Sequence, residues 1–346
     1  MTVRVLVARL DSDGDVLLSG PAIRAAAAGW HGDDTEVRLL CGPAGERAAR
    51  LLPGVAEVAV WPCPWIEADP DPVHANDIRS LHRLLDAAPP QVALILTSFH
   101  QSPLPLALLL RLAGVSTIAA ISADYPGSLL DVRLRPGEDF DDDAPEPQRA
   151  LRVARAAGFA LPQHDCGRLR VTEPPDVRRL TGSGDYVVVH PGASVPARAI
   201  PPKRCREVVV ALHRSGWRVA VTGGPAERAL TAYVAAGKAL DLGGRTSFAA
   251  LAGVLAGAHA VVVGNTAPAH LAAAVGTPVV SLFAPVVPAA RWAPYRVPHV
   301  LLGDQRAGCA GSRARVCPLP GHPCLDSVSA AEVVGAVESL VAGAAA

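Results

Sequence analysis

The chain has 346 residues, half of them hydrophobic, and its 32 basic and 32 acidic side chains cancel to a formal net charge of zero. This length suits two domains of about 150–170 residues each. The balanced charge argues against a protein that follows a nucleic-acid backbone, no apolar run approaches the ~20 residues of a membrane span, and charged residues come too early for a signal peptide. We therefore expect a cytoplasmic protein.

Strands and helices alternate through the first half of the chain. Apolar runs predict strands over 3–8, 36–40, 57–60, 92–96 and 116–121. Helical patterns cover 20–29, 43–51, 74–87 and 104–112. Strands of this kind, separated by helices, indicate an α/β domain with a parallel sheet covered on both faces.

The alternation breaks after the fifth strand and then restarts. Residues 135–148 are acidic and proline-containing, as in a mobile loop, and a helix over 149–158 follows. The extended stretch 161–175 is interpreted as a linker, so the domains are expected at 1–165 and 176–346.

A second α/β unit follows this linker. Its strands are predicted at 186–190, 217–221, 260–263 and 278–282. Its helices are predicted at 202–215, 225–236, 247–257, 268–275 and 329–341, and the last is allowed to pack back on the first domain. Two parallel sheets imply a cleft, with ligands bound beyond the carboxyl ends of the strands.

Three aspartates, Asp11, Asp13 and Asp15, follow the first strand at alternate positions. A calcium loop is excluded because Val16 and Ala22 stand where such a loop needs Gly and Glu. Turn or N-cap residues, or a D-x-D metal–diphosphate pair, remain alternatives. In the catalytic interpretation, Gly14 permits a tight turn and Asp15 projects from a loop as a general base, with Asp11, Asp13 and Gly14 beside it.

Three further loops follow predicted strands and suit an anionic ligand. The first, H-P-G-A-S at 190–194, leads to Ser194, Arg198 and Lys203, which favour a phosphate. The second contains Gly223 and Glu227, and a carboxylate there suits ribose hydroxyls. The third runs from Asn265 through Thr266 and Ala267 to a helix whose first turn carries His270, and free N–H groups at its start suit a pyrophosphate.

Other motifs are missing or ambiguous. The first turn has no dinucleotide fingerprint, and the sequence has no Walker loop. Near the C-terminus, Cys309, Cys317, His322 and Cys324 have spacings unlike common zinc pairs, so a disulfide or plain surface thiols are favoured over a structural metal. This cysteine-containing loop is expected near the cleft.

Taken together, four stretches resemble glycosyltransferase family 9, the heptosyltransferase-like enzymes with the GT-B fold. They are R-L-D-x-x-G-D-V-L-L-x-x-P-A-I-R, H-P-G-A-S, G-G-P-x-E-R and G-N-T-x-P-A-H-L-A-A-A-x-G-T-P-V-V. The resemblance spans nearly the whole chain. It implies two Rossmann-like domains whose parallel sheets face a central cleft, the first binding the acceptor and the second the nucleotide sugar.

The resemblance also implies roles for these residues. Asp15 is the candidate base, and Arg198, with Lys203 as a rival, meets the donor phosphate. Glu227 holds ribose, and Thr266, Ala267 and His270 face the pyrophosphate and sugar. The expected activity is inverting and independent of metal and cofactor, with ADP-heptose as the co-substrate and a hydroxyl acceptor.

Two departures from the family pattern lie in the fourth stretch. The family often carries D-T-G where this chain has Asn265-Thr266-Ala267. These departures motivate one alternative, a nucleotide-sugar-binding protein without turnover. A GT-B-like epimerase or phosphorylase is a second alternative. We expect a monomer that binds no nucleic acid and has no membrane span, with peripheral membrane contact left open.

Overall fold

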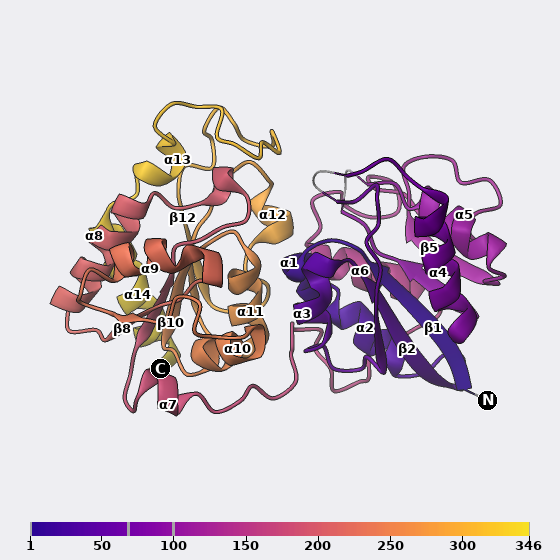
Figure 1. Cartoon of the computed structure of the whole chain (residues 1–346), viewed down its shortest axis with the longest axis horizontal. Helices are drawn as coiled ribbons and strands as arrows, with labels where there is room; N and C mark the ends of the chain where they lie inside the picture. Colours follow the sequence, from indigo (N-terminus) through magenta and orange to yellow (C-terminus); the bar gives the residue numbers. More distant parts are fainter. Residues whose placement is uncertain (1, 68–69, 99–100, 346) are drawn as a thin grey trace. The chain divides into compact units, whose positions relative to one another are not determined.

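The computed structural model describes residues 2–67, 70–98 and 101–345. The chain forms two compact units, Met1–Thr172 and Glu173–Ala346 (Figure 1). The first unit extends past the expected boundary at residue 165, because residues 165–172 pack on it. Asp165 accepts two hydrogen bonds from Arg24, and Thr172 donates its backbone N–H to Leu51.

The first unit is a six-stranded, wholly parallel sheet in the order β3-β2-β1-β4-β5-β6. Its strands are β1 (Thr2–Arg9), β2 (Asp34–Cys41), β3 (Glu57–Val60), β4 (Val92–Ile95), β5 (Thr117–Ile121) and β6 (Val132–Leu134). Its helices are α1 (Asp13–Leu18), α2 (Gly20–Ala27), η1 (Pro43–Gly45), α3 (Glu46–Ala49), α4 (Ala75–Ala87), α5 (Leu104–Leu112) and α6 (Glu146–Ala156).

Helices cover both faces of this sheet. α4 and α5 contribute Leu81, Leu85 and Leu110 to one buried cluster, while α2 packs on α6 and on β2. β4 is buried along its whole length, as expected of a central parallel strand. The two-faced burial explains why the strands appear as continuous apolar runs in the sequence.

The second unit is also a six-stranded parallel sheet, in the order β12-β11-β10-β7-β8-β9. Its strands are β7 (Val187–His190), β8 (Val219–Val221), β9 (Leu240–Asp241), β10 (Ala260–Gly264), β11 (Val279–Leu282) and β12 (His299–Leu302). Its helices are α7 (Arg178–Thr181), η2 (Pro196–Arg198), α8 (Pro202–Arg214), η3 (Pro225–Glu227), α9 (Arg228–Ala235), α10 (Phe248–Ala256), α11 (Ala267–Val275), α12 (Ala289–Trp292), α13 (Pro323–Asp326) and α14 (Ala330–Ala345).

The last helix, α14, packs on α8 and on strands β10, β11 and β12 of its own unit. Its buried residues Val333 and Val337 lie in that unit's core. Its apolar face is thus covered within the second unit.

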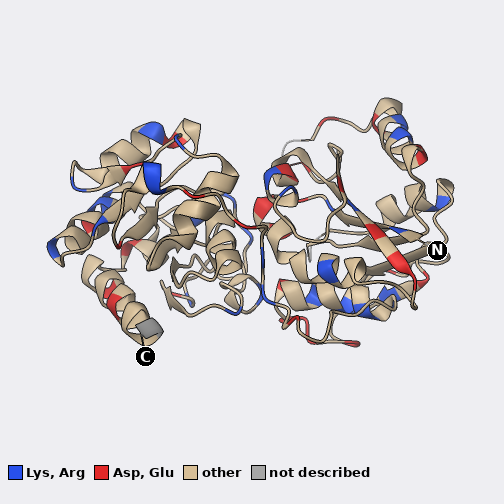
Figure 2. Ribbon diagram, turned by 90° about the horizontal axis from the view of Figure 1, so that it is seen from below, with Lys and Arg blue, Asp and Glu red and all other residues tan. Residues whose placement is uncertain are grey.

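Charged residues of both signs are interspersed along the two units (Figure 2). No helix in the described part of the chain is long and apolar enough to cross a membrane.

Candidate functional site

Both sheets have the same connectivity. When the strands of each unit are numbered from its first strand, both sheets have the order 3-2-1-4-5-6, read in the second unit from β9 to β12. In such sheets the order in which successive strands are added reverses between the first and fourth strands, and ligands bind beyond the carboxyl ends of those two strands. The fold therefore directs attention to the loops after β1 and β4, and to the loops after β7 and β10.

At the first of these points, β1 ends in a buried arginine. The Arg9 side chain is only 3% exposed, and its Nε lies 2.9 Å from Asp11 Oδ2. Its Nη2 donates at 3.0 Å both to Asp15 Oδ1 and to Ser98 Oγ, which follows β4. Gln101, also beyond β4, donates to Asp11 at 2.5 Å. The two central loops thus meet on the guanidinium of Arg9.

A third carboxylate completes this charged cluster from α6. Glu146 Oε2 lies 3.8 Å from Arg9 Nη1, and Glu146 Oε1 lies 3.5 Å from Arg149 Nε. Of the three carboxylates around Arg9, Asp15 is the most exposed, at 21% against 11% for Asp11 and 3% for Glu146. Asp15 is therefore the carboxylate that solvent and a small ligand reach first.

Burial and neighbouring charges change the pKa values of Asp11 and Arg9 within the cluster. Burial raises the pKa of Asp11 to about 6; the Arg9 charge opposes this rise and the Asp15 charge adds to it. The carboxylates around it raise the pKa of Arg9 despite its burial, so the guanidinium stays charged. A cluster with a fixed cation and a carboxyl that titrates near pH 6 can hold and release a proton close to neutrality.

Asp13 and Gly14 take other positions than expected. Asp13 is buried and turned to α3, where it accepts from Arg47 Nη2 at 2.6 Å and from the Ala48 backbone N–H at 3.0 Å. It ties α1 to α3 and is separate from the Arg9 cluster. Gly14 lies inside α1, so the expected tight turn is wrong, and Asp15 projects from the first turn of a short helix rather than from a loop.

In the second unit, the loops after β7 and β8 meet on a glycine. His190, at the end of β7, has its Nδ1 2.9 Å from Thr222 Oγ1, which follows β8. A Cβ at Gly192 would lie 1.8 Å from Glu227 Oε1, so only glycine leaves room for this carboxylate. Glu227 also accepts the Gly224 backbone N–H at 2.7 Å. Gly223, beside it, would place a Cβ 3.1 Å from the same carboxylate.

The sequence analysis assigned a role to neither member of the His190–Thr222 pair. Burial lowers the pKa of His190, with the Glu227 charge opposing it, so the imidazole is neutral at pH 7. The sequence does contain one sign that could have pointed to His190 and Thr222: each directly follows the apolar run of its strand.

The loop after β10 is fixed by Asn265. Its side-chain amide donates to the Ala284 carbonyl and accepts the Ala284 N–H, both at 3.2 Å. This pairing joins the loops after β10 and β11, and it needs a donor and an acceptor on one side chain. Asn265 is 4% exposed. The Asn265 amide is thus paired within the second unit, whereas the sequence analysis placed Asn265 in the loop expected to bind the donor.

Helix α11 begins next to this pairing. Thr266 is its N-cap residue, and within the described residues its buried Oγ1 has no hydrogen-bond partner. Ala267 is half-buried at the first helical position, and His270 is buried in the first turn. The Thr266 and Ala269 N–H groups are bonded to Gly264 and Thr266, and Pro268 has none, so the helix start presents the Ala267 N–H and the Thr266 hydroxyl to an anion.

The structure separates the two candidate phosphate-binding cations. Arg198 ends η2, and its carbonyl oxygen lies against Gly264, where an added Cβ would approach it to 2.7 Å. It therefore stands at the carboxyl end of β10. Lys203 is exposed in the first turn of α8 and borders an outer hollow with Arg206, Arg214 and Tyr233. Ser194 is exposed in the loop between β7 and η2.

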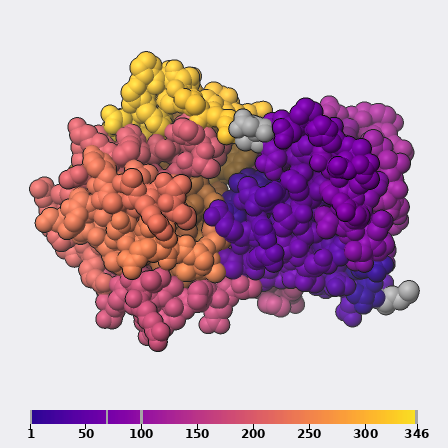
Figure 3. Space-filling model, in the orientation of Figure 1, coloured from indigo at the N-terminus to yellow at the C-terminus, as the bar shows by residue number. Residues whose placement is uncertain are grey.

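The Cys-rich segment, residues 303–326, lies at the surface of the second unit (yellow in Figure 3). It holds the η2 turn through one backbone and one side-chain contact: the Ala197 N–H donates to the Arg315 carbonyl at 2.9 Å, and the Nε2 of the His322 side chain lies 3.1 Å from Ala197 O. It also holds the loop after β11, through Gly311 N–H to Pro285 O and Arg313 N–H to Val286 O, both 2.8 Å.

The thiols of this segment differ from the expected surface thiols. Cys309 and Cys324 are buried, at 2% and 1% exposure, and Cys317 is half-buried. Among the residues that the structure describes, no group of three or more His, Cys, Asp or Glu side chains is arranged to hold a metal ion.

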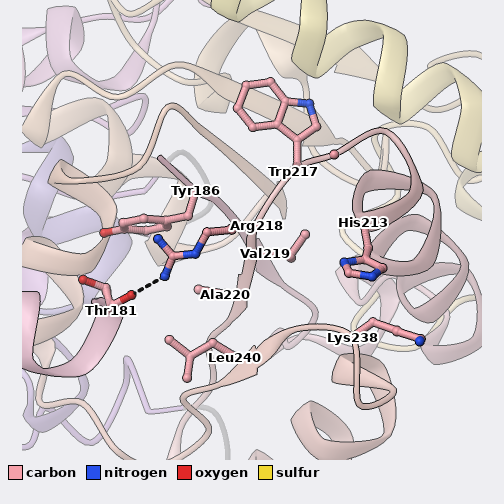
Figure 4. Close-up of a pocket in the computed structure, with 10 residues that line it drawn as sticks. Thr181, Tyr186, His213, Trp217, Arg218, Val219, Ala220, Lys238 and Leu240 are labelled. Carbon is pink, nitrogen blue, oxygen red and sulfur yellow. Dashed lines mark hydrogen bonds between the residues drawn. The ribbon is translucent and has the colours of Figure 1, made fainter. Parts of the chain in front are cut away.

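A cavity of about 340 Å³ lies at the amino-terminal ends of the strands of the second sheet, opposite the ends that carry the loops described above (Figure 4). Tyr186, Trp217 and Lys238 line it, and Arg218 crosses it to donate to the Thr181 carbonyl at 2.8 Å. It is remote from the strand ends that carry the loops above, so it plays no part in the candidate site.

Comparison with known proteins shows which family the chain belongs to. Residues 130–322 match the model of glycosyltransferase family 9 (heptosyltransferase), more than half of the chain. The chain belongs to glycosyltransferase family 9. The matched residues include the loops after β7, β8 and β10, whereas the Arg9–Asp15 loop precedes them.

One curated relative shares part of this region. Lipopolysaccharide heptosyltransferase 3 of Escherichia coli is 33% identical over 105 residues. The match covers 29% of this chain and 31% of the relative, so the aligned part is less than a third of the relative's length.

Solved structures of family 9 proteins share the fold across nearly the whole chain. A family 9 glycosyltransferase from Veillonella parvula superposes with a TM-score of 0.76 at 16% identity, covering 99% of this chain and 97% of that one. E. coli ADP-heptose lps heptosyltransferase II gives 0.72 at 17%, covering 99% and 100%. E. coli heptosyltransferase WaaC with ADP-2-deoxy-2-fluoro heptose gives 0.69 at 21%, covering 97% and 99%. The α/β GT-B fold expected from the sequence, with two Rossmann-like domains, is confirmed.

Proposed function

We propose that this family 9 protein transfers a sugar, heptose in the first instance, from a nucleotide-diphosphate donor to a hydroxyl acceptor with inversion at the anomeric carbon. The observation that carries this proposal is the set of charged and hydrogen-bonding groups found in each unit where the strand order reverses. A carboxylate on a fixed cation lies at the first, and an anion-binding turn and helix start lie at the second.

Asp15 is proposed as the general base. Its carboxylate accepts hydrogen bonds from Arg9 and from Ser12 Oγ at 3.1 Å, and it stays partly exposed. These contacts orient one carboxylate for the acceptor hydroxyl proton. As that proton moves to Asp15, the hydroxyl oxygen bonds to the anomeric carbon from the face opposite the diphosphate, and the carbon–oxygen bond to the diphosphate breaks.

Stabilisation of the leaving diphosphate is proposed for the second unit. Negative charge grows on the phosphate oxygens as the bond breaks, and fixed cations and backbone dipoles stabilise such charge. Arg198 and the start of α11, with Thr266, Ala267 and His270, supply these groups. Because they are charges and dipoles of the chain itself, we propose that transfer needs no divalent metal. A related family structure, TibC of E. coli, is described as iron-containing.

The proposed donor, a nucleotide sugar, is supported by Glu227 and by the names of similar solved structures. A carboxylate beside the glycines of the β7 and β8 loops suits the ribose hydroxyls of a nucleotide. Two of the similar structures are named for ADP-heptose or its fluoro analogue, which makes ADP-heptose the first donor to test. The acceptor class, the monomeric state and a cytoplasmic location stay predictions.

The first experiment tests the donor. Unfolding of the second unit is followed with ADP, UDP and GDP, since a ligand at 100 times its Kd stabilises the folded state by about 2.7 kcal/mol. We expect ADP to stabilise this unit most. Equal, negligible shifts for all three nucleotides would remove the nucleotide-sugar function.

The second experiment tests the base. Asp15→Asn should lower the rate of transfer, or of donor hydrolysis when no acceptor is supplied, by about 100-fold or more while ADP binding stays within about twofold. Asp13→Asn is the matched control, because Asp13 lies on the same helix but pairs with Arg47 and Ala48. Full turnover in Asp15→Asn would reject the base assignment.

A further inference from the structure

Basic side chains line the cavity at the amino-terminal ends of the second sheet, which the candidate site does not use. Its volume of about 340 Å³ falls in the usual range of small-molecule sites, roughly 300–1,000 Å³. None of the residues that line it is acidic, whereas Arg218, Lys238 and His213 are basic. Among the residues that the structure describes, none of these three forms an ion pair with a carboxylate. The cavity therefore attracts an anion that the chain itself does not supply.

Arg218 is held in place by the loop that follows α7. Its Nη1 donates to the Ser183 carbonyl at 2.6 Å, and its Nη2 donates to the Thr181 carbonyl at 2.8 Å. Gly182 and Gly184 have φ angles of +72° and +99°, which glycine adopts without a steric penalty. A Cβ at Gly182 would lie 3.3 Å from Nη2, and a Cβ at Gly184 would lie 3.1 Å from Nη1. The loop is thus shaped closely around the guanidinium.

This arrangement leaves Arg218 with donors and charge for a further partner. A guanidinium has five N–H donors and stays protonated, and the two carbonyls use two donors without adding a negative charge. The residue is also exposed, so a ligand can reach it. Because neutral groups already fix this cation, binding an anion would not have to order it.

The basic side chains lie on two sides of the cavity. Figure 4 shows the Arg218 guanidinium on one side, and His213 and Lys238 on the other. His213 comes from the last turn of α8, and Lys238 follows α9. Val219 and Ala220, which are buried apolar residues of β8, lie between the two sides. A molecule with an anionic group at each end and an apolar middle matches this arrangement.

We propose that this cavity is a second ligand site, which binds a small organic dianion with a carboxylate at each end. Arg218 binds one carboxylate through its remaining N–H groups, and Lys238 and His213 bind the other. The apolar middle of the ligand covers Val219 and Ala220. This inference does not rest on the proposed function, because the cavity and the anion-binding loops lie at opposite ends of the strands.

A purely structural role would account for Arg218 alone. Its carbonyl bonds join the loop after α7 to β8, and they would stabilise the unit with or without a ligand. Lys238 and His213 have no such task, since within the described part of the chain neither side chain makes a hydrogen bond. Lys238 is also exposed, so its removal should leave the fold intact. Substitution of Lys238 therefore distinguishes a ligand site from a structural clamp.

The test titrates the whole chain by calorimetry with dicarboxylates of increasing length, from succinate to pimelate, at constant ionic strength. We expect at least one to bind with a Kd of about 1 mM or lower, and at least about tenfold more tightly than the monocarboxylate of equal length. Inorganic phosphate, whose charge lies at one point, should also bind at least about tenfold more weakly. The tightest dicarboxylate should slow amide hydrogen exchange in the segment 181–184.

Variants locate the binding. Lys238→Ala should weaken binding of that dicarboxylate about tenfold or more, and Arg218→Gln should do the same. Arg214→Ala is the matched control, because it removes an exposed cation next to His213 that lines the outer hollow instead. Its affinity should stay within about twofold of the wild type. If Arg218→Gln folds poorly, Lys238→Ala decides the test.

No binding of any dicarboxylate at about 20 mM, no preference over the monocarboxylate, or unchanged affinity in Lys238→Ala would overturn the proposal. Saturating ADP should leave the dicarboxylate affinity unchanged. Competition by ADP would place the dicarboxylate at the loops after β7, β8 and β10, and it would overturn the second site while leaving the proposed function standing. Failure of ADP to bind would count against the proposed function alone.

Discussion

The Arg9 guanidinium donates to Asp15 and to Ser98 through the same nitrogen, Nη2, at 3.0 Å in each case. This single group therefore fixes Asp15, the most exposed of the three carboxylates around Arg9, to the end of β4. The guanidinium both orients the Asp15 carboxylate and places a positive charge beside it, and substitutions of Arg9 can separate these two effects.

Arg9→Lys keeps the charge but loses the planar fork that reaches three carboxylates and Ser98. We expect the transfer rate to fall about tenfold, with an unchanged acidic limb of the pH–rate profile. Arg9→Gln also removes the cation, which disfavours the ionised base, so its acidic limb should move to higher pH. Steady-state rates between pH 5 and 9, with circular dichroism to verify folding, test both. Identical profiles for the two variants would contradict a charge role for Arg9.

Asp11 should make stability depend on pH. Its folded-state pKa of about 6 exceeds the ordinary value of 3.8, so the folded state binds the proton more tightly than the unfolded chain. The stabilisation from that proton is complete below about pH 4 and is lost as pH rises through 6. Relative to Asp11→Asn, which does not titrate, the wild type should lose about 2–3 kcal/mol between pH 4 and pH 7. Denaturant unfolding at each pH measures this difference, and a constant difference would show that Asp11 titrates normally.

Gly192 should be intolerant of a side chain. In Gly192→Ala the new Cβ would lie 1.8 Å from Glu227 Oε1, so the carboxylate must move. We expect ADP affinity to fall at least about tenfold while the unit stays folded, measured by calorimetry. Gly335→Ala in α14 is the matched control, because a Cβ there has no atom within 4 Å. Unchanged affinity in Gly192→Ala would remove Glu227 from the nucleotide site.

Asn265 should resist conversion to the acidic residue that is common in the family. In Asn265→Asp the carboxylate can still accept the Ala284 N–H but faces the Ala284 carbonyl without a proton to donate. The second unit should lose about 2 kcal/mol at pH 7. Part of this loss should be recovered below pH 4, where a protonated Asp donates again. Stability equal to the wild type at pH 7 would contradict the pairing.

The sequence predicts the central strands and most helices because their patterns are strong. β3 and α5 begin and end where expected, and β4 is buried on both faces. β6, β9 and β12 were missed: β6 and β9 are half-buried, β12 begins with an exposed residue, and all three lie at or near sheet edges where no long apolar run is required. Three closely spaced aspartates predict a loop before Val16, whereas the structure has the short helix α1 from Asp13 to Leu18.

The candidate site was only partly predictable for a related reason. Asp15, Glu227 and Arg198 follow strands, and strand ends are visible in the sequence. Arg9 ends an apolar run and looks like a simple strand terminus, yet its partner Glu146 lies on α6, far along the chain. Contacts between distant segments, such as Asn265 with Ala284, depend on which strands are neighbours, and sequence periodicity does not reveal that order.

Each six-stranded sheet carries its own complete set of covering helices and its own buried interior. We therefore expect each half to unfold in a transition of its own. A substitution near β1 that abolishes turnover by melting its half would leave nucleotide binding untouched and so imitate the loss of a catalytic group. Two separate calorimetric transitions, each assigned to one half, would tell such a variant apart from a true chemical knockout.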